Sequence, residues 1–279
     1  MIKLGLIGYP LGHSLSPRIH NAALKSCGLE GNYSLFPIHP EDKQSLEDLL
    51  NRVRAGEIHG LNVTIPHKQN VIPFLDKLTL ATKSVGAVNT IYLHNNKLIG
   101  DNTDAPGFLS DLHAFLTDQK LSVAHRPSSL VLGAGGSARA VVYALVNDGW
   151  DVTIAARRIE QSQELALQFG NVKAIEFNLQ TFQRLDLQLI VNTTPVGMTP
   201  ETDQSPWPEN LFFPKNAAIY DLVYNPSETK LVREARCQGL NATTGLGMLI
   251  EQAALAFEIW TGYTPSREVL FEAVNQTAN

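Results

Sequence analysis

Apolar and polar positions along the chain predict repeated strand–helix–strand units. Short apolar runs alternate with segments whose apolar residues lie three or four positions apart, and this alternation restarts near residue 130. Expected strands cover 4–9, 32–38, 58–65, 91–93, 98–99, 130–132, 151–156, 187–191 and 217–222. Expected helices cover 16–28, 41–54, 105–116, 138–147, 161–169, 246–260 and 265–274. Such alternation predicts an α/β fold class with mostly parallel sheets covered by helices on both faces.

Turn and capping residues set the limits of several of these elements. Ser16 before Pro17 predicts a helix N-cap with proline in the first turn, and Pro66 is expected to end the strand before it. Asn95-Asn96 between two apolar runs predicts a hairpin, whereas the polar stretch 122–128 predicts a loop. The two blocks predict an N-terminal domain, 1–104, completed by returning helices in 245–279, and a nucleotide-binding domain, 105–244.

Composition excludes several classes of function. Among 279 residues the formal net charge is −5, and no basic run is present, which argues against a nucleic-acid partner. Cys27 and Cys237 are far apart and form no CxxC pair, so we expect two small buried or half-buried thiols in a reducing compartment. No histidine spacing suggests a metal site, and no apolar stretch is long enough to cross a membrane. We therefore expect a cytoplasmic protein without a metal.

The stretch Gly133-x-Gly135-x-x-Ala138 follows an apolar run and precedes a helical pattern. Gly133 would permit a tight turn, Gly135 a close approach of backbone to a pyrophosphate, and Ala138 close packing of helix on strand. The N–H groups and dipole of the helix N-terminus would then face the phosphates. This context predicts a dinucleotide-binding turn of Rossmann type; the alternative is a purely structural turn.

The end of the next expected strand distinguishes between the two nicotinamide dinucleotides. An NAD site places an acidic residue there for the ribose hydroxyls, but here Ala156 is followed by Arg157-Arg158. Guanidinium groups form charge-assisted, bidentate hydrogen bonds with phosphates. The sequence therefore predicts NADP; the alternative is a pair of solvated surface charges.

Polar residues also gather where strands of the first block are expected to end. Ser14 and Ser16 could turn both hydroxyls to one ligand, and Asn62 and Thr64 share a face if both lie on a strand. Lys68 is expected at the start of a helix, where its positive charge opposes the helix dipole. This mildly unfavourable placement suggests a functional role. Each has a plain alternative, which is helix capping for the serines and solvation for the lysine.

Six motifs taken together resemble the shikimate dehydrogenase family. They are SLSP, NVTIPHK, GAVNT, GDNTD, GAGGSAR and GLGMLIEQ, and they run in family order from residue 14 to residue 252. The resemblance implies a reversible reduction of 3-dehydroshikimate to shikimate with NADPH, in the shikimate pathway that leads to chorismate and the aromatic amino acids. It also implies a cleft between a substrate domain and an NADP-binding domain.

The resemblance further implies roles for individual residues. Lys68 and Asp104 match the catalytic pair. Substrate contacts are implied for Ser14, Ser16, Asn62, Thr64, Lys68, Asn89, Asp104, Tyr224 and Gln252. Cofactor contacts are implied for Gly133, Ala134, Gly135, Gly136, Ser137, Ala156, Arg157, Arg158, Thr193, Leu222 and Gly245.

One departure and several alternatives remain. Many NADP-using relatives have Asn-Arg-Thr where this chain has Ala156-Arg157-Arg158, so only the central arginine is kept. The nearest alternative function is a quinate/shikimate dehydrogenase with broader substrate or NAD use. A non-catalytic NADPH-binding regulator would be expected to lose Lys68 or Asp104, and a methylene-tetrahydrofolate dehydrogenase is disfavoured by the polar residues. Whether Lys68 transfers the proton or mainly stabilises charge stays open. We expect a monomer or homodimer with a small-molecule substrate.

Overall fold

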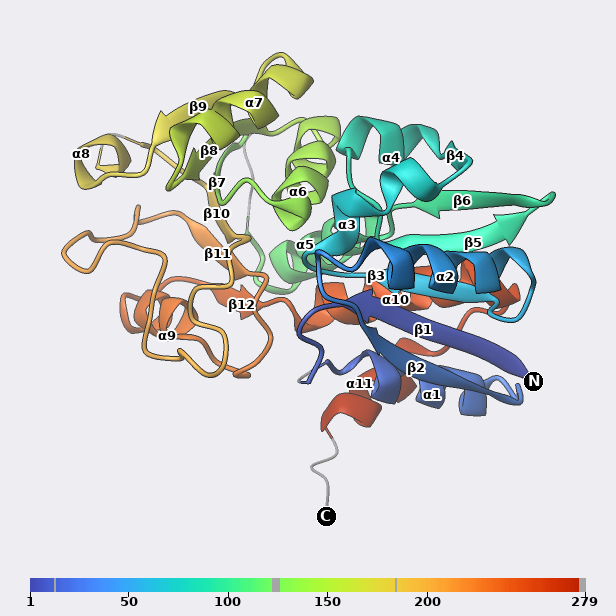
Figure 1. Ribbon diagram of the computed structural model, residues 1–279. Helices are drawn as coiled ribbons and strands as arrows, with labels where there is room; N and C mark the ends of the chain where they lie inside the picture. Colours follow the sequence, from blue (N-terminus) through green and yellow to red (C-terminus); the bar gives the residue numbers. More distant parts are fainter. Residues whose placement is uncertain (13, 122–125, 184, 276–279) are drawn as a thin grey trace. The chain divides into compact units, whose positions relative to one another are not determined.

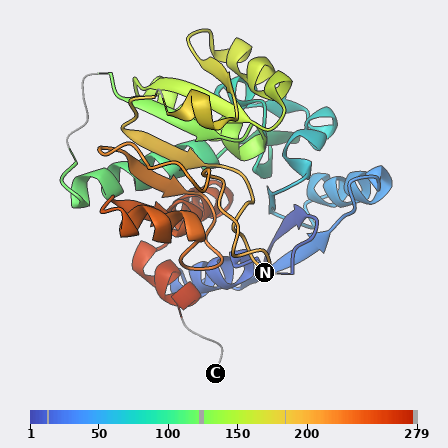
Figure 2. The same cartoon turned by 90° about the vertical axis from the view of Figure 1, so that its left-hand side faces the viewer.

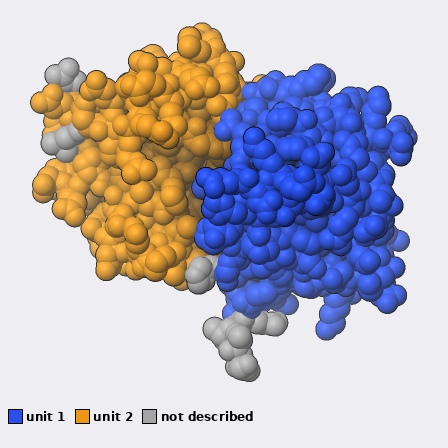
Figure 3. Space-filling view, in the orientation of Figure 1, with its two compact units in different colours: residues 1–107, 250–279 blue, residues 108–249 orange. Residues whose placement is uncertain are grey.

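The computed structural model describes residues 1–12, 14–121, 126–183 and 185–275. The chain forms two compact units, coloured separately in Figure 3: unit 1 contains residues 1–107 and 250–279, and unit 2 contains residues 108–249. The predicted domain boundaries fall at 104/105 and 244/245. Residues 122–125 of the predicted loop and residues 276–279 of the predicted C-terminal segment lie outside the described residues.

Unit 1 is built on a six-stranded sheet of order β2-β1-β3-β5-β6-β4 (Figure 1). Its strands are β1 (Ile2–Gly8), β2 (Gly31–Pro37), β3 (Gly60–Val63), β4 (Lys77–Leu78), β5 (Thr90–His94) and β6 (Lys97–Asp101). Its helical segments are α1 (Ser16–Ser26), α2 (Lys43–Arg54), α3 (His67–Asn70), the 3₁₀ turn η1 (Ile72–Phe74), α4 (Leu80–Val85), the start of α5 (Asp104–Asp118), most of α10 (Leu246–Thr261), and α11 (Arg267–Asn275).

Strand direction in this sheet follows from the turns. β1 runs parallel to β2 and β3, as expected for strands joined through helices, and β4 runs parallel to β6. β5 is antiparallel to both of its neighbours. The predicted hairpin joins β5 to β6, and Asn95 and Asn96 take the positive φ angles of 49° and 59° that a tight two-residue turn requires. The sheet is therefore mixed, with parallel pairs in the majority.

The apolar face of α2 shows why this sequence packs as it does. Leu46, Leu49, Leu50 and Val53 recur at helical spacing, are all buried, and pack against sheet residues including Ile91. The helix begins where the Asp42 side chain accepts a hydrogen bond from the Ser45 N–H at 3.0 Å. This core fixes the strand ends from which the polar side chains of unit 1 extend.

Unit 2 contains a fully parallel sheet of order β12-β11-β10-β7-β8-β9. Its strands are β7 (Ser128–Leu132), β8 (Asp151–Ala156), β9 (Lys173–Glu176), β10 (Leu189–Asn192), β11 (Ala218–Asp221) and β12 (Ala242–Thr244). The helices between them are α6 (Gly136–Asn147), α7 (Ile159–Phe169), α8 (Leu179–Phe182) and α9 (Lys230–Cys237). α6 packs on β7 and β8, α7 on β8 and β9, and α9 on β11 and β12 (Figure 2).

In chain order the strands β8 and β9 are added on one side of β7, and β10, β11 and β12 on its other side. The strand order therefore reverses between β7 and β10. Ligands of open α/β sheets bind at such a reversal, beyond the carboxyl ends of the strands. The glycine turn of this chain follows β7 directly. The predicted α/β fold class with two mostly parallel sheets is confirmed.

Three local expectations are corrected. The strand predicted over 58–65 is only β3, Gly60–Val63, although Thr64 N–H still donates to Ile7 O at 2.8 Å. Ser16 is not the N-cap of α1: the cap is Leu15, without a side-chain hydrogen bond, and Ser16 is the first helical residue. Cys237 is exposed rather than buried or half-buried, because it ends α9 away from the apolar face formed by Leu231, Val232 and Ala235.

Candidate functional site

The charged centre of unit 1 is an ion pair between Lys68 and Asp104. The Lys68 Nζ and Asp104 Oδ2 atoms are 2.5 Å apart, and the two side chains are only 14% and 7% exposed. Lys68 is on the short helix α3, where the buried ring of neighbouring His67 bonds the Ile38 carbonyl at 2.7 Å. Asp104 begins α5, where the positive end of the helix dipole favours a carboxylate. A buried, fixed ammonium can hold an oxygen atom and supply it with a proton.

Asn89 joins this pair to other polar side chains. Its amide nitrogen donates to Asp104 Oδ1 at 2.9 Å and to Gln252 Oε1, on α10, at 3.3 Å. Its amide oxygen accepts from the Thr103 N–H at 2.7 Å and from the Thr90 hydroxyl at 3.0 Å, which fixes the orientation of the amide. Sequence segments as distant as 68, 89, 104 and 252 therefore meet in one buried hydrogen-bond network.

Asn62 extends the network to β3. It is buried, and its amide nitrogen donates to the Asn89 carbonyl at 3.2 Å. Thr64 is half-buried just beyond the end of the strand. Ser14 and Ser16 are linked to each other, since the Ser16 N–H donates to Ser14 Oγ at 3.3 Å.

The glycine turn of unit 2 has the geometry expected of a phosphate-binding turn. Gly133 has φ +112°, and a Cβ placed there would lie 2.6 Å from Thr193 Oγ1, so a larger residue is excluded both by conformation and by space. Gly135 faces open space and is the N-cap of α6, which begins at Gly136 rather than at the predicted Ala138. Ala138 is fully buried. A bare, accessible helix N-terminus can accept a pyrophosphate.

The loops after β10 and β11 lie beside this turn. The Thr193 N–H and hydroxyl both bond the carbonyl of Leu132, the last residue of β7, at 2.9 and 2.6 Å. The Leu222 N–H donates to the Asn192 carbonyl at 2.9 Å, and a Cβ on Gly245 would contact the Leu222 backbone. These contacts bring the predicted cofactor residues Thr193, Leu222 and Gly245 together at the carboxyl edge of the sheet.

Asp221 holds the same two loops from inside. Its side chain accepts hydrogen bonds from Asn192 Nδ2 at 2.8 Å, from the Val223 N–H at 3.0 Å and from the Thr229 hydroxyl at 2.7 Å. Burial raises the pKa of Asp221 to about 6, and these hydrogen bonds only partly offset the effect of burial. The sequence analysis assigned no role to Asp221.

The pKa shift of Asp221 predicts a pH-dependent stability. Because the folded state holds this proton up to about pH 6 and the unfolded state loses it near 3.8, folding stability should fall as pH rises through that window. Replacing Asp221 with asparagine removes this titration. Relative to wild type, the free energy of unfolding of the variant should rise by about 2 kcal/mol between ~pH 4.5 and ~pH 7.5, as measured by urea unfolding.

A suitable control for this experiment is Asp203→Asn, which changes an exposed carboxylate in the same unit. Its stability should follow that of wild type across the same pH range. If the free energy of unfolding depended on pH in the same way for wild type and for Asp221→Asn, the argument would be contradicted.

Ala156 ends β8, and the two arginines that follow it are exposed. Within the described part of the chain, neither Arg157 nor Arg158 forms an ion pair. Arg158 is also the N-cap of α7. Two guanidinium groups at a helix N-terminus are therefore available to an anion.

Other features lie outside these two groups of residues. Tyr224 belongs to unit 2, and burial raises the pKa of its hydroxyl.

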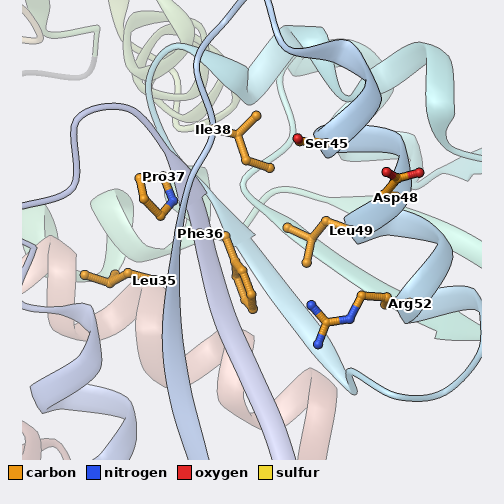
Figure 4. A pocket seen from close by; sticks show the side chains of 8 residues that line it. All are labelled: Leu35, Phe36, Pro37, Ile38, Ser45, Asp48, Leu49 and Arg52. Carbon is orange, nitrogen blue, oxygen red and sulfur yellow. The ribbon is translucent and has the colours of Figure 1, made fainter.

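A shallow pocket between β2 and α2 contains none of the predicted site residues (Figure 4). It is lined by Leu35, Phe36, Pro37, Ile38, Ser45, Asp48, Leu49 and Arg52. Among the described residues, no group of His, Cys, Asp and Glu side chains could hold a metal ion. No helix in the described ranges is long and apolar enough to span a membrane.

Tyr33 was missed by the sequence analysis. It is buried in β2, where its hydroxyl donates to Asn62 Oδ1 at 2.8 Å and is hydrogen-bonded to the side chain of Ser16. No local pattern marked it, because β2 also contains Asn32 and Ser34, and Tyr33 is the residue of this strand that is buried.

Comparison with known proteins gives consistent matches along the chain. Family models match three segments: "Shikimate dehydrogenase substrate binding domain" at residues 6–91, "Shikimate / quinate 5-dehydrogenase" at 116–193, and "Shikimate 5'-dehydrogenase C-terminal domain" at 245–274. A curated relative from Carboxydothermus hydrogenoformans, "Shikimate dehydrogenase (NADP(+))", is 40% identical over 277 residues, covering 97% of this chain and 95% of its own. A relative of the same name from Bacillus subtilis is 40% identical over 269 residues, covering 95% and 93%.

Solved structures agree in fold. Shikimate 5-dehydrogenase from Thermus thermophilus, in complex with NADP(H) and shikimate, has a TM-score of 0.87 at 38% identity and covers 99% of both chains. Quinate dehydrogenase from Corynebacterium glutamicum, in complex with NAD, has the same TM-score at 30% identity and also covers 99% of both chains.

Proposed function

Because the chain belongs to the shikimate dehydrogenase family, we propose that it catalyses the reversible, NADPH-dependent reduction of 3-dehydroshikimate to shikimate. The observation that carries this proposal is the buried Lys68–Asp104 pair, whose carboxylate is hydrogen-bonded to the amide of Asn89, which in turn bonds Gln252. A ring carrying hydroxyl groups needs such donors and acceptors, and a site built for them discriminates strongly against analogues that lack them.

Lys68 and Asp104 manage the proton in this proposal. During ketone reduction the carbon receives hydride, and its oxygen gains a proton that the Lys68 ammonium supplies from Nζ. Asp104 holds the ammonium in place and is itself held by Asn89. The substrate is positioned by hydroxyls and amides from Ser14, Ser16, Asn62, Thr64, Asn89, Tyr224 and Gln252.

The residues of unit 2 fit NADP. The open backbone at Gly135 and the N-terminus of α6 suit a pyrophosphate, and the unpaired guanidinium groups of Arg157 and Arg158 suit a 2′-phosphate. When bound, the nicotinamide supplies hydride transfer. The remaining contacts are assigned to Gly133, Ala134, Gly136, Ser137, Ala156, Thr193, Leu222 and Gly245.

These assignments give each domain its own function. Residues 1–104 with 245–279 form the substrate-binding and catalytic domain, and 105–244 form the NADP-binding domain. We expect a monomer or homodimer that works in the cytoplasm without a nucleic-acid partner, which sedimentation of the purified protein with and without DNA would test.

A quinate/shikimate dehydrogenase is the second candidate, favoured by the likeness to quinate dehydrogenase. The two functions are separated by an activity assay that follows the absorbance of the reduced dinucleotide at about 340 nm. Shikimate and quinate are each tested with NADP and with NAD. We expect shikimate with NADP to give the highest kcat/KM, because Arg157 and Arg158 replace the acidic residue of an NAD site. Faster turnover with quinate, or with NAD, would overturn the proposal.

A further inference from the structure

The hydroxyl of Tyr33 connects two predicted substrate-binding residues that lie on different elements. It donates to Asn62 Oδ1, on β3, at 2.8 Å and is hydrogen-bonded to the side chain of Ser16, at the start of α1. All three side chains are buried. Tyr33 thus ties the beginning of a helix to the end of a strand through one oxygen atom.

The ring of Tyr33 is held as firmly as its hydroxyl. It stacks on His20 with ring centroids 4.3 Å apart and planes 4° from parallel. The Tyr33 N–H donates to Asn21 Oδ1 at 3.0 Å, so two consecutive residues of α1, His20 and Asn21, contact Tyr33. Burial lowers the pKa of His20 to about 3 and raises that of Tyr33 well above its ordinary value, so both rings stay neutral.

The consequence for Asn62 is a fixed amide. Its nitrogen donates to the Asn89 carbonyl at 3.2 Å and to Thr90 Oγ1 at 3.5 Å, while its oxygen accepts from Tyr33. Both amide hydrogens are therefore used within the protein. Asn62 is thus held in one orientation, and its amide has no hydrogen left to donate to a substrate.

We propose that Tyr33 is a positioning residue for the substrate, which acts by holding Ser16 and Asn62 in the arrangement that binds shikimate. This inference rests on the proposed function, and extends it to a residue that does not itself touch the substrate. Because its contacts are within unit 1, its effect should be on shikimate and not on NADP.

The substitution Tyr33→Phe tests this directly, since phenylalanine keeps the ring stacked on His20 and removes only the oxygen. Loss of the two hydrogen bonds should raise the KM for shikimate about tenfold. The KM for NADP should stay within about twofold of wild type. Calorimetric titration of shikimate into the enzyme without NADP should show the same roughly tenfold weakening.

Tyr92→Phe is the matched control, because Tyr92 is half-buried in β5 of the same sheet and has no predicted role. It should leave both KM values unchanged. An unchanged KM for shikimate in Tyr33→Phe, or an equal rise for NADP, would overturn the inference while leaving the proposed function intact. A wild-type protein that neither binds nor oxidises shikimate would overturn both.

A double-mutant cycle separates positioning from a general loss of stability. If Tyr33 acts partly through Asn62, the effect of Tyr33→Phe on shikimate binding should shrink by roughly threefold or more in an Asn62→Ala background. Fully additive effects would show that the two side chains bind independently and would overturn the inference.

Discussion

Lys68→Ala should lower kcat for the interconversion of shikimate and 3-dehydroshikimate roughly 10²- to 10⁴-fold, the range typical of losing a general acid or base. As the ketone oxygen gains negative charge, the Lys68 ammonium both stabilises that charge and supplies the proton. Without the ammonium, a water molecule must stabilise the charge and supply the proton, although the position of Lys68 is largely closed to solvent. Initial-rate kinetics in both directions should show the loss in kcat, with little change in the KM for NADP.

The substitution has a structural side effect that needs its own control. Asp104 is 7% exposed and would lose its partner, and breaking a buried ion pair costs about 3–5 kcal/mol. Lys68→Met combined with Asp104→Asn removes both charges and keeps both volumes, so this variant should melt closer to wild type and remain inactive. Lys83→Ala, at an exposed lysine in α4 of the same unit, should have no effect on kcat. A loss confined to the KM for shikimate would remove Lys68 from proton transfer.

Local chemistry explains which parts of the fold the sequence predicts. The strand 151–156 and the start of the last long helix at Leu246 are reproduced to the residue, since buried apolar runs and helical spacing are local signals. The Asn95-Asn96 hairpin is confirmed for the same reason. β9 and β12 were not predicted, because such short strands are fixed by their neighbouring strands rather than by their own pattern. α9 was also missed, although Leu231, Val232 and Ala235 recur at helical spacing and Thr229 caps the helix.

The candidate site residues also differ in whether a local pattern in the sequence identifies them. The glycine turn can be recognised from sequence because each small residue answers a local steric demand, as the contact between a Cβ at Gly133 and Thr193 illustrates. Asn89 and Asp104 had no role on local pattern alone, and only the resemblance to a family gave them one. Tyr33 and Asp221 could not be found, because their importance comes from hydrogen bonds to residues distant in sequence, such as Tyr33 to Asn62 and Asp221 to Asn192.

Removing both guanidinium groups in Arg157→Ala/Arg158→Ala should lower kcat/KM for NADP roughly 10²-fold and leave kcat/KM for NAD within about threefold. A charge-assisted hydrogen bond contributes about 1.5–3 kcal/mol, so even one such bond to the 2′-phosphate accounts for most of this loss. NAD has a hydroxyl at that position and gives the arginines no charge to bind. The preference for NADP should therefore nearly disappear, as measured by initial rates with each dinucleotide at saturating shikimate.

The exposure of the two arginines makes this prediction sensitive to ionic strength as well as to mutation. Both are exposed, so salt should weaken NADP binding in wild type and have less effect in the double variant. Lys173→Ala removes an exposed positive charge from the neighbouring strand β9 and should leave the ratio of NADP to NAD activity unchanged. If activity with NAD falls in parallel with activity with NADP, the arginines support the loop rather than the phosphate. Arg157→Lys, which keeps the charge but not the planar fork, should fall between wild type and Arg157→Ala, because bidentate geometry and charge both contribute to phosphate binding.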